Sequence, residues 1–249
     1  MYVNWQLDFD STVPLLQNWT VPLYLLGRRP EFPHPREAEP DGLLALGGDL
    51  APRRLLEAYR RGIFPWPWGE AEPLAWYSPP ERCVFRPGGV VAGRSLRRTL
   101  RSGRFECRVD TRFPSVIRLC AATPRPGQRG TWITAAVARA YTRMHRLGHA
   151  HSVETWSDGA LVGGLYGLAI GGAFFAESMF HLAPDASKFA LYHLSEMLRD
   201  RRFALIDAQI PTPFLARLGG RTIPRDQYLE ELGRAIDLPI RFAHPGATP

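Results

Sequence analysis

Two polar side chains stand near the end of an otherwise apolar segment late in the chain. Asp207 and Gln209 are two residues apart within residues 203–210, and residues 204–206 form a continuous apolar run typical of a buried strand. Because side chains alternate along a strand, we expect Asp207 and Gln209 to share one face while Ile206 enters the other. A carboxylate in that setting costs free energy unless it has a partner. The pair could serve acid–base or positioning chemistry, or Asp207 could be a strand-end cap or half of a salt bridge.

A third carboxylate, Glu177, interrupts an apolar segment between Ala173 and Phe180. An ionised carboxylate in such surroundings requires a compensating partner, and a cation serves best. Glu177 could hold a cationic group of a substrate. It could equally form a structural ion pair with Lys188 or with an arginine, and the sequence leaves both readings open.

The other reactive side chains do not form a familiar catalytic or metal-binding pattern. Cys83, Cys107 and Cys120 are widely spaced, without a CxxC or Cys/His pattern, which argues against a disulfide framework and structural zinc. His149 and His151 lack a third ligand, so we favour a structural or RNA-facing role over metal binding. No Ser-His-Asp or Cys-His arrangement is evident from the spacing. We therefore expect no metal site.

Four arginines recur at helical spacing in the first half of the chain. Arg94, Arg97, Arg98 and Arg101 occupy positions i, i+3, i+4 and i+7, which predicts that they share one face of a helix. Such a face repels itself unless an anion lies against it, and no acidic residue is interleaved. We favour a track for nucleic-acid phosphates over a merely solvated helix. Lys188 is the only lysine in the chain and either contributes a compact cationic contact or survives by chance.

Two clusters of aromatic residues and prolines lie close together. They read Phe-Pro-Trp-Pro-Trp at residues 64–68 and Trp-Tyr-Ser-Pro-Pro at residues 76–80. Proline fixes the backbone, and aromatic rings offer flat faces at low entropic cost. The clusters could form an irregular lid over the core or a wall on which a nucleotide stacks.

The composition is that of a globular protein. The 249 residues are 45% hydrophobic and 22% charged, and 31 basic against 24 acidic residues give a net charge of +7. This surplus is compatible with a polyanionic partner without being diagnostic of one. No apolar run approaches the roughly 20 residues of a membrane span, and residues 1–5 do not resemble a signal peptide. With three scattered cysteines, we expect a cytoplasmic protein with no membrane association.

Periodicity and turn residues predict alternating helices and strands in the second half. The order predicts an α+β protein with a smaller N-terminal α/β domain, residues 1–95, and a C-terminal domain with a mixed, largely antiparallel sheet, residues 96–249. Helices are expected over about residues 51–61 with Asp49 as N-cap, 134–147 capped by Thr134, 187–199 and 226–236, and strands over 151–156, 161–169, 173–180 and 203–210, with a hairpin turn at Asp158-Gly159.

Nine stretches, taken together and in order, resemble the leucyl/phenylalanyl-tRNA–protein transferase family. None is decisive alone, but nine in order make coincidence implausible. The stretches are residues 42–50, 61–66, 76–79, 130–134, 147–154, 161–167, 177–180, 186–188 and 205–209.

The resemblance implies a monomeric enzyme with a GNAT-like acyltransferase domain and neither metal nor dissociable cofactor. It implies transfer of Leu, Phe or Met from aminoacyl-tRNA to proteins whose N-terminus is Arg or Lys, which marks them for degradation by the N-degron route. In this reaction an α-amine attacks an ester carbonyl that is already activated. Positioning with modest acid–base help therefore suffices.

The resemblance also assigns roles to residues. Asp207 would orient the attacking amine or help to deprotonate it, and Gln209 would hold Asp207 or the carbonyl. Glu177 would anchor the cationic end of the acceptor, and the arginine face would bind tRNA together with Lys188. The apolar aminoacyl pocket and the adenosine wall are assigned to Trp66, Trp132, Leu165, Phe174, Ser178, Met179, Leu191, Leu194 and Ile206, although the apolar members would equally suit a plain core.

The sequence departs from the family pattern at two places. Residues 211–214 read Pro-Thr-Pro-Phe where the family usually carries a polar turn containing Asp-His, and Arg129 stands where an acidic residue is frequent. We expect the first change to stiffen the loop and to alter the preference for acceptors.

Two other functions are compatible with parts of the sequence. A GNAT-type enzyme with an acyl-CoA donor would require a pyrophosphate-binding loop before a helix, for which residues 125–130 are a faint candidate. A non-catalytic RNA-binding module gains nothing from carboxylates such as Asp207 and Glu177 beside a phosphate track.

Overall fold

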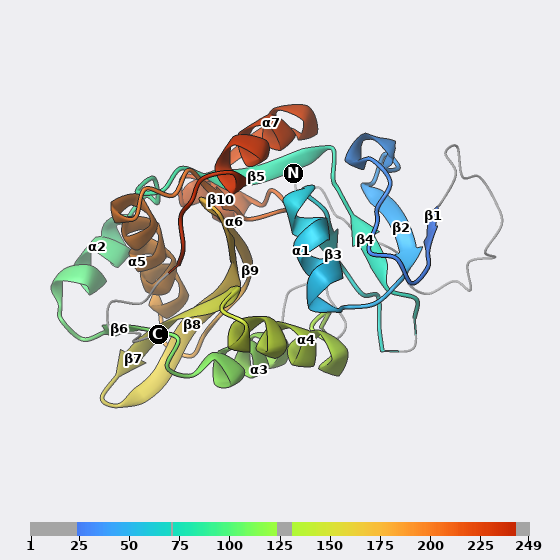
Figure 1. The fold of residues 1–249 in the computed structure, drawn as a ribbon. Coiled ribbons are helices and arrows are strands. Elements are labelled where there is room, and N and C mark those ends of the chain that lie inside the picture. Colours follow the sequence, from blue (N-terminus) through green and yellow to red (C-terminus); the bar gives the residue numbers. More distant parts are fainter. Residues whose placement is uncertain (1–23, 71, 124–130, 243–249) are drawn as a thin grey trace.

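The computed structural model describes residues 24–70, 72–123 and 131–242, and they form two β-sheets with helices packed around them (Figure 1). The first sheet has four short strands in the order β1-β2-β4-β3. Strands β1 and β2 are parallel and the other pairs are antiparallel. The strands are β1 (Tyr24–Leu26), β2 (Leu43–Gly47), β3 (Phe64–Pro65) and β4 (Ala75–Tyr77).

The second sheet has seven strands in the order β11-β5-β10-β9-β8-β7-β6. All of its pairs are antiparallel except β9 with β10, which run parallel with helix α5 (Ala186–Asp200) connecting them. The expected α+β class with a mixed, largely antiparallel sheet is confirmed. The strands are β5 (Glu81–Phe85), β6 (Glu106–Val109), β7 (Ala150–Ser157), β8 (Ala160–Ile170), β9 (Ala173–His181), β10 (Leu205–Asp207) and β11 (Arg221–Pro224).

Helices cover both faces of the seven-stranded sheet. Consecutive strand residues belong to different core clusters, for example Phe174 and Phe175, so the two clusters lie on opposite faces. Helix α5 packs in the cluster of Phe174, and α1, α3, α4 and α7 contribute to the cluster of Phe175. The remaining helices are α1 (Pro52–Arg60), α2 (Arg94–Arg101), α3 (Phe113–Ala122), α4 (Ala135–Arg146), α6 (Pro213–Arg217), α7 (Arg225–Ile236) and the short 3₁₀ turn η1 (Pro35–Glu37).

Most local predictions for the second half are confirmed. Thr134 caps α4 by accepting a hydrogen bond from the Val137 backbone N–H. The hairpin between β7 and β8 turns at Asp158 and Gly159, both with positive φ, as a two-residue turn of this kind requires.

Two local predictions are wrong. Ala51, not Asp49, is the N-cap of α1, and the Asp49 carboxylate instead accepts a hydrogen bond from the Ala51 backbone N–H. The strand expected over residues 203–210 ends at Asp207, because Gln209 adopts a left-handed φ of 61° that breaks the alternation.

The change from one sheet to the other falls between Tyr77 at the end of β4 and Glu81 at the start of β5. Strand β5 therefore belongs to the seven-stranded sheet although it precedes residue 95. Residues 1–23 and the loop candidate at 125–130, including Arg129, lie outside the described residues. The division of the chain at residue 95 stays a prediction.

Candidate active site

The parallel strands β9 and β10 separate after a short paired stretch. Their register runs from Ala173–Leu205 to Phe175–Asp207, after which β9 continues while β10 ends. At the same point β9 has a bulge against β8, since Tyr166 pairs with Ser178 and Gly167 with Ala176. Glu177 is the extra residue of this bulge, and bulges commonly redirect a side chain beside a functional site. The split between the strands is our candidate active site.

Asp207 is completely buried and its carboxylate is saturated with donors. The Arg82 guanidinium donates from Nε to Oδ1 at 3.0 Å and from Nη2 to Oδ2 at 2.8 Å. The Tyr228 hydroxyl donates to Oδ2 at 2.7 Å, and the Gln209 backbone N–H donates to Oδ1 at 2.8 Å. Asp207 therefore forms a salt bridge, which was one of the alternatives that the sequence left open. With its lone pairs occupied, the carboxylate can orient its neighbours better than it can accept a proton.

Glu177 lies in the same split with neutral donors only. Gln209 Nε2 donates to Oε1 at 2.8 Å, and the Tyr141 hydroxyl donates to Oε2 at 3.3 Å. Burial raises the pKa of Glu177 to about 8, which the negative charge of Asp207 reinforces and hydrogen bonding by Tyr59 and Tyr141 opposes. A carboxyl with such a pKa exchanges its proton near neutrality, as an acid–base group must.

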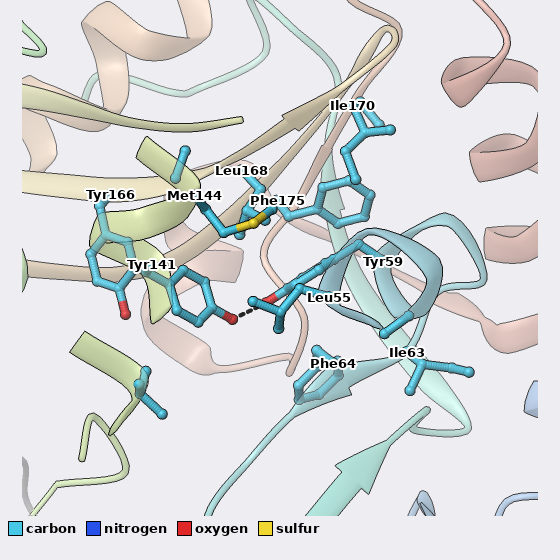
Figure 2. Close-up of a cluster of buried hydrophobic side chains, with 14 of the residues drawn as sticks. Leu55, Tyr59, Ile63, Phe64, Tyr141, Met144, Tyr166, Leu168, Ile170 and Phe175 are labelled. Atoms are coloured by element: carbon cyan, nitrogen blue, oxygen red, sulfur yellow. Dashed lines mark hydrogen bonds between the residues drawn. The ribbon is translucent and has the colours of Figure 1, made fainter. Parts of the chain in front are cut away.

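Two tyrosines extend this group toward the N-terminal part of the chain. Tyr59 from α1 and Tyr141 from α4 are both fully buried, and their hydroxyl groups share a hydrogen bond (Figure 2). The Tyr59 and Phe175 rings pack edge to face, next to the start of the strand split. Through Tyr141 the hydroxyl pair is connected to the Glu177 carboxyl. The candidate site therefore joins helices α1 and α4 to strands β9 and β10.

Sequence reasoning did not identify Arg82, Tyr228, Tyr59 or Tyr141. It recognised that buried Asp207 requires a partner, but nothing in the spacing selects one cation among 31 basic residues. One signal was available for Arg82, because it stands in a strand whose following residues, 83–85, are all apolar and buried. A cation in such a segment also requires a buried partner of opposite charge.

The ion pair considered between Glu177 and Lys188 is not formed. Lys188 Nζ binds Asp185 Oδ1 at 2.8 Å instead. Asp185 also accepts hydrogen bonds from Ser95 and Thr99 of α2, so this carboxylate attaches α2 to the start of α5. Lys188 thus has a structural partner, and its predicted contact with RNA stays a prediction.

The arginine face of α2 is present as predicted. Leu96 and Thr99 are its buried residues, and the opposite side is exposed. Among the described residues, no ion pair involves the four arginines of this face, which are Arg94, Arg97, Arg98 and Arg101.

The predicted aminoacyl pocket is not brought together as one surface. Trp66 and Trp132 lie side by side with ring centroids 5.9 Å apart, half-buried against the core cluster that contains Phe175. Met179 is half-buried against the other cluster, and Ser178 is half-buried in β9. The remaining five residues are fully buried inside the cluster on the α5 side: Leu165, Phe174, Leu191, Leu194 and Ile206. Their role in a donor pocket stays a prediction.

One of the two histidines considered in the sequence, His151, has a structural partner. His151 Nδ1 lies 2.7 Å from Asp110 Oδ2, which gives this side chain a structural partner. Within residues 24–70, 72–123 and 131–242, no group of three or more His, Cys, Asp or Glu side chains could hold a metal ion. In the same ranges no helix is both long and apolar enough to cross a bilayer.

Sequence comparisons identify the family to which the chain belongs. The sequence profile of the leucyl/phenylalanyl-tRNA protein transferases matches residues 84–233, and the profile of their N-terminal domain matches residues 48–80. The relative from Anaeromyxobacter sp. (strain K), named leucyl/phenylalanyl-tRNA–protein transferase, is 52% identical over 92% of this chain and 99% of its own. The chain belongs to this transferase family. It is an aminoacyltransferase with the fold class that the sequence predicted.

Other members of the family are equally similar. The transferase of Dechloromonas aromatica is 56% identical over 83% of this chain and 89% of its own, and that of Myxococcus xanthus is 51% identical over 89% and 95%. Solved structures give weaker likenesses. FemX has a TM-score of 0.47 at 9% identity (70% of this chain and 66% of that chain), and a GCN5-related N-acetyltransferase from Kribbella flavida has 0.35 at 11% (73% and 63%). The assignment to the transferase family therefore rests on sequence.

Residues 211–214, which depart from the family pattern, lead into the short helix α6. Thr212 caps the short helix α6 by accepting a hydrogen bond from the Leu215 backbone N–H at 3.1 Å. Pro213 occupies the first turn, and Phe214 packs partly buried against the core on the α5 side. The loop is thus partly apolar, as expected, and its expected stiffness stays a prediction.

Proposed function

We propose that this protein transfers leucine, phenylalanine or methionine from aminoacyl-tRNA to the N-terminal Arg or Lys of acceptor proteins, acting as a cytoplasmic monomer. The product would be marked for degradation by the N-degron route. The observation that carries the proposal is the match to named transferases over 92% of the chain at 52% identity. The strand split with its two unlike carboxyl groups supports it.

The reaction requires the acceptor α-ammonium to lose a proton before its nitrogen attacks. A bond forms between that nitrogen and the ester carbonyl carbon, the bond from this carbon to the ribose oxygen breaks, and the oxygen takes up a proton. We assign the proton transfer to Glu177, whose pKa of about 8 is close to that of an α-amine. Its anionic form would also attract the cationic acceptor.

Asp207 and Gln209 act on Glu177 rather than on the substrate in this proposal. Asp207 is fixed by Arg82 and Tyr228 and holds the Gln209 backbone N–H. The Gln209 amide then holds Glu177 Oε1. Asp207 is thus a positioning residue that keeps the left-handed backbone of Gln209 in place.

The groups proposed to bind the donor lie on both faces of the seven-stranded sheet. The Trp66 and Trp132 rings, 5.9 Å apart, would receive the terminal adenosine, because aromatic faces stack on any base. The arginine face of α2, together with Lys188, would bind phosphates of the tRNA. Met179, half-buried against the α5-side core, would adapt to the different donor side chains.

Transfer of radiolabelled leucine from Leu-tRNA into a protein with N-terminal Arg tests the proposal. We expect label in that acceptor and none in the same protein with N-terminal Ala, and absence of label from both would refute the function. The Glu177→Gln variant can still accept the Gln209 bond, loses the acceptor for the Tyr141 hydroxyl and removes the titrating, acceptor-attracting group, so kcat/KM for the acceptor should fall at least tenfold. Heat release on adding acetyl-CoA in a calorimeter would favour an acyl-CoA donor instead.

A further inference from the structure

A second basic surface lies on the face of the sheet opposite α2. Helices α3 and α4 border an open groove of about 740 Å3. Its arginines are Arg118 from α3 and Arg139, Arg143 and Arg146 from α4, above an apolar floor that includes Ile117. We call these four arginines the α3–α4 arginine groove.

The arginines of this groove form no ion pair with the described residues, although Asp49, Glu70 and Glu72 line a neighbouring hollow that includes Arg139. All four arginines are exposed. Of the residues that the structure describes, no Asp or Glu lines the groove. The spacing of positions 139, 143 and 146 puts three guanidinium groups on one side of α4 within about 10 Å of helix length. Like charges so close destabilise a helix unless an anion neutralises them.

The groove is near the tryptophan pair and shares helix α4 with the candidate active site. Thr134 and Arg139 line both the groove and a second hollow of about 300 Å3 that Pro67 also lines. Pro67 follows Trp66 and Thr134 comes two residues after Trp132, so this second hollow lies beside the tryptophan pair. Helix α4 itself carries Tyr141, which donates to Glu177. One helix thus joins the groove to the reacting region.

We propose that the α3–α4 arginine groove binds the sugar-phosphate backbone next to the aminoacylated 3′ end of the tRNA, a contact that rests on the proposed function. Guanidinium groups bind phosphate oxygens in pairs, and several at helical spacing fit a chain of phosphates. The acceptor protein is the poorer occupant, because its N-terminal end is cationic and the groove would repel it. Helix α2 lies on the α5 side of the sheet, so its arginine face is separate from the groove.

The test compares the variant R139A/R143A/R146A with wild type and with R217A/R221A/R234A, which removes three exposed arginines elsewhere. Anisotropy of labelled tRNA measures binding across a series of salt concentrations. The groove variant should bind on the order of tenfold more weakly at 0.15 M salt, and its log–log salt slope should be shallower by about 2, since each single-strand phosphate contributes about 0.7. The control variant should bind like wild type.

Two further measurements distinguish lost phosphate contacts from damage to the reaction centre or to the fold. With an aminoacyl-adenosine donor, which has no upstream phosphates, the groove variant should transfer at the wild-type rate. R139K/R143K/R146K should recover most of the tRNA affinity, because lysine retains the charge. Circular dichroism checks that the variants are folded. If the triple variant unfolds, R143A replaces it, because Arg143 is exposed. The log–log salt slope of R143A should be shallower by about 0.7, the contribution of one phosphate.

Unchanged tRNA binding and salt slope in the groove variants would overturn the inference. So would a rise in KM for the acceptor protein with tRNA binding intact, which would assign the groove to a protein partner. Binding of tRNA is measured without catalysis, so the inference can be judged separately from the transfer reaction. Wild type that binds tRNA in the groove yet transfers no label would refute the proposed function alone.

Discussion

Asp207 and Glu177 are two buried carboxylic acids of one site in opposite surroundings. Asp207 is paired with a buried guanidinium and accepts two further hydrogen bonds. Glu177 has no ion-pair partner among the described residues and is held by an amide and a hydroxyl. Gln209 touches both, through its backbone and its side chain. The contrast shows that one kind of functional group can supply a fixed charge and an exchangeable proton within one site.

The greatest loss of stability should come from removing the cation of the fixed pair. Arg82→Met should lower the free energy of unfolding by about 3–5 kcal/mol, because it leaves Asp207 buried without a counter-charge. Urea denaturation at pH 7 measures this loss. Replacing Asp207 with Leu in the same chain should restore part of the stability. A loss below about 1 kcal/mol would show that the Asp207 charge does not depend on Arg82, and the contrast between the two carboxyl groups would not hold.

The pH dependence of stability tests the other carboxyl. The folded-state pKa of Glu177, about 8, lies above its ordinary value of 4.5. The stability from this group is therefore fully present below pH 4.5 and is lost as the pH rises through 8. Between pH 5 and 8, wild type should lose about 3–4 kcal/mol that Glu177→Gln does not lose. If the free energies of unfolding of the two proteins changed equally between pH 5 and pH 8, Glu177 would not hold an exchangeable proton.

Removing a tyrosine hydroxyl from beside each carboxyl group shows which of the two groups carries the stronger negative charge. Tyr228→Phe removes a donor from the ionised Asp207 and should cost about 1.5–3 kcal/mol. Tyr141→Phe, made in a Tyr59→Phe chain so that the bond between the two hydroxyls is already absent, removes a 3.3 Å bond to Glu177 and should cost about 0.5–1.5 kcal/mol. Thermal unfolding of both variants gives the order. The reverse order would place the stronger charge on Glu177.

The exposed arginines of α2 should contribute least to stability. Charge reversal with R97E/R98E should change the free energy of unfolding by less than about 0.5 kcal/mol, because neither side chain is buried or paired. It should weaken tRNA binding and flatten its salt dependence. Binding like that of wild type would reduce this face to a solvated helix.

The fold was predictable where the pattern is local. Helix α4 with its Thr134 cap and the hairpin turn at Asp158-Gly159 follow from neighbouring residues alone. Strand β5 was not predicted, because it is stabilised by pairing with β10 and β11, more than a hundred residues later. Strand β10 was expected to be longer, and its early end depends on the left-handed conformation of Gln209.

The site was predictable in its carboxyl groups and not in its partners. The apolar residues on either side of Asp207 and Glu177 in the sequence predict that both carboxyl groups are buried and need a polar or cationic partner. Which group compensates each is decided by tertiary structure. Arg82 and Tyr228 reach Asp207 from elements that are 125 residues before it and 21 after it. The spacing of residues within one segment does not show which distant residues will contact it in the fold.

The long separation between Arg82 and Asp207 matters for a chain that is still being synthesised. Strands β7, β8 and β9 follow one another closely and can pair as they emerge, but β5 must wait for β10 and β11. The pair with Asp207 closes 125 residues after Arg82 is made, and the hydroxyl of Tyr228 arrives 146 residues after it. Contacts of this range form late in folding. Prematurely terminated chains that lack these residues therefore carry a basic surface on α4 without a completed reaction centre.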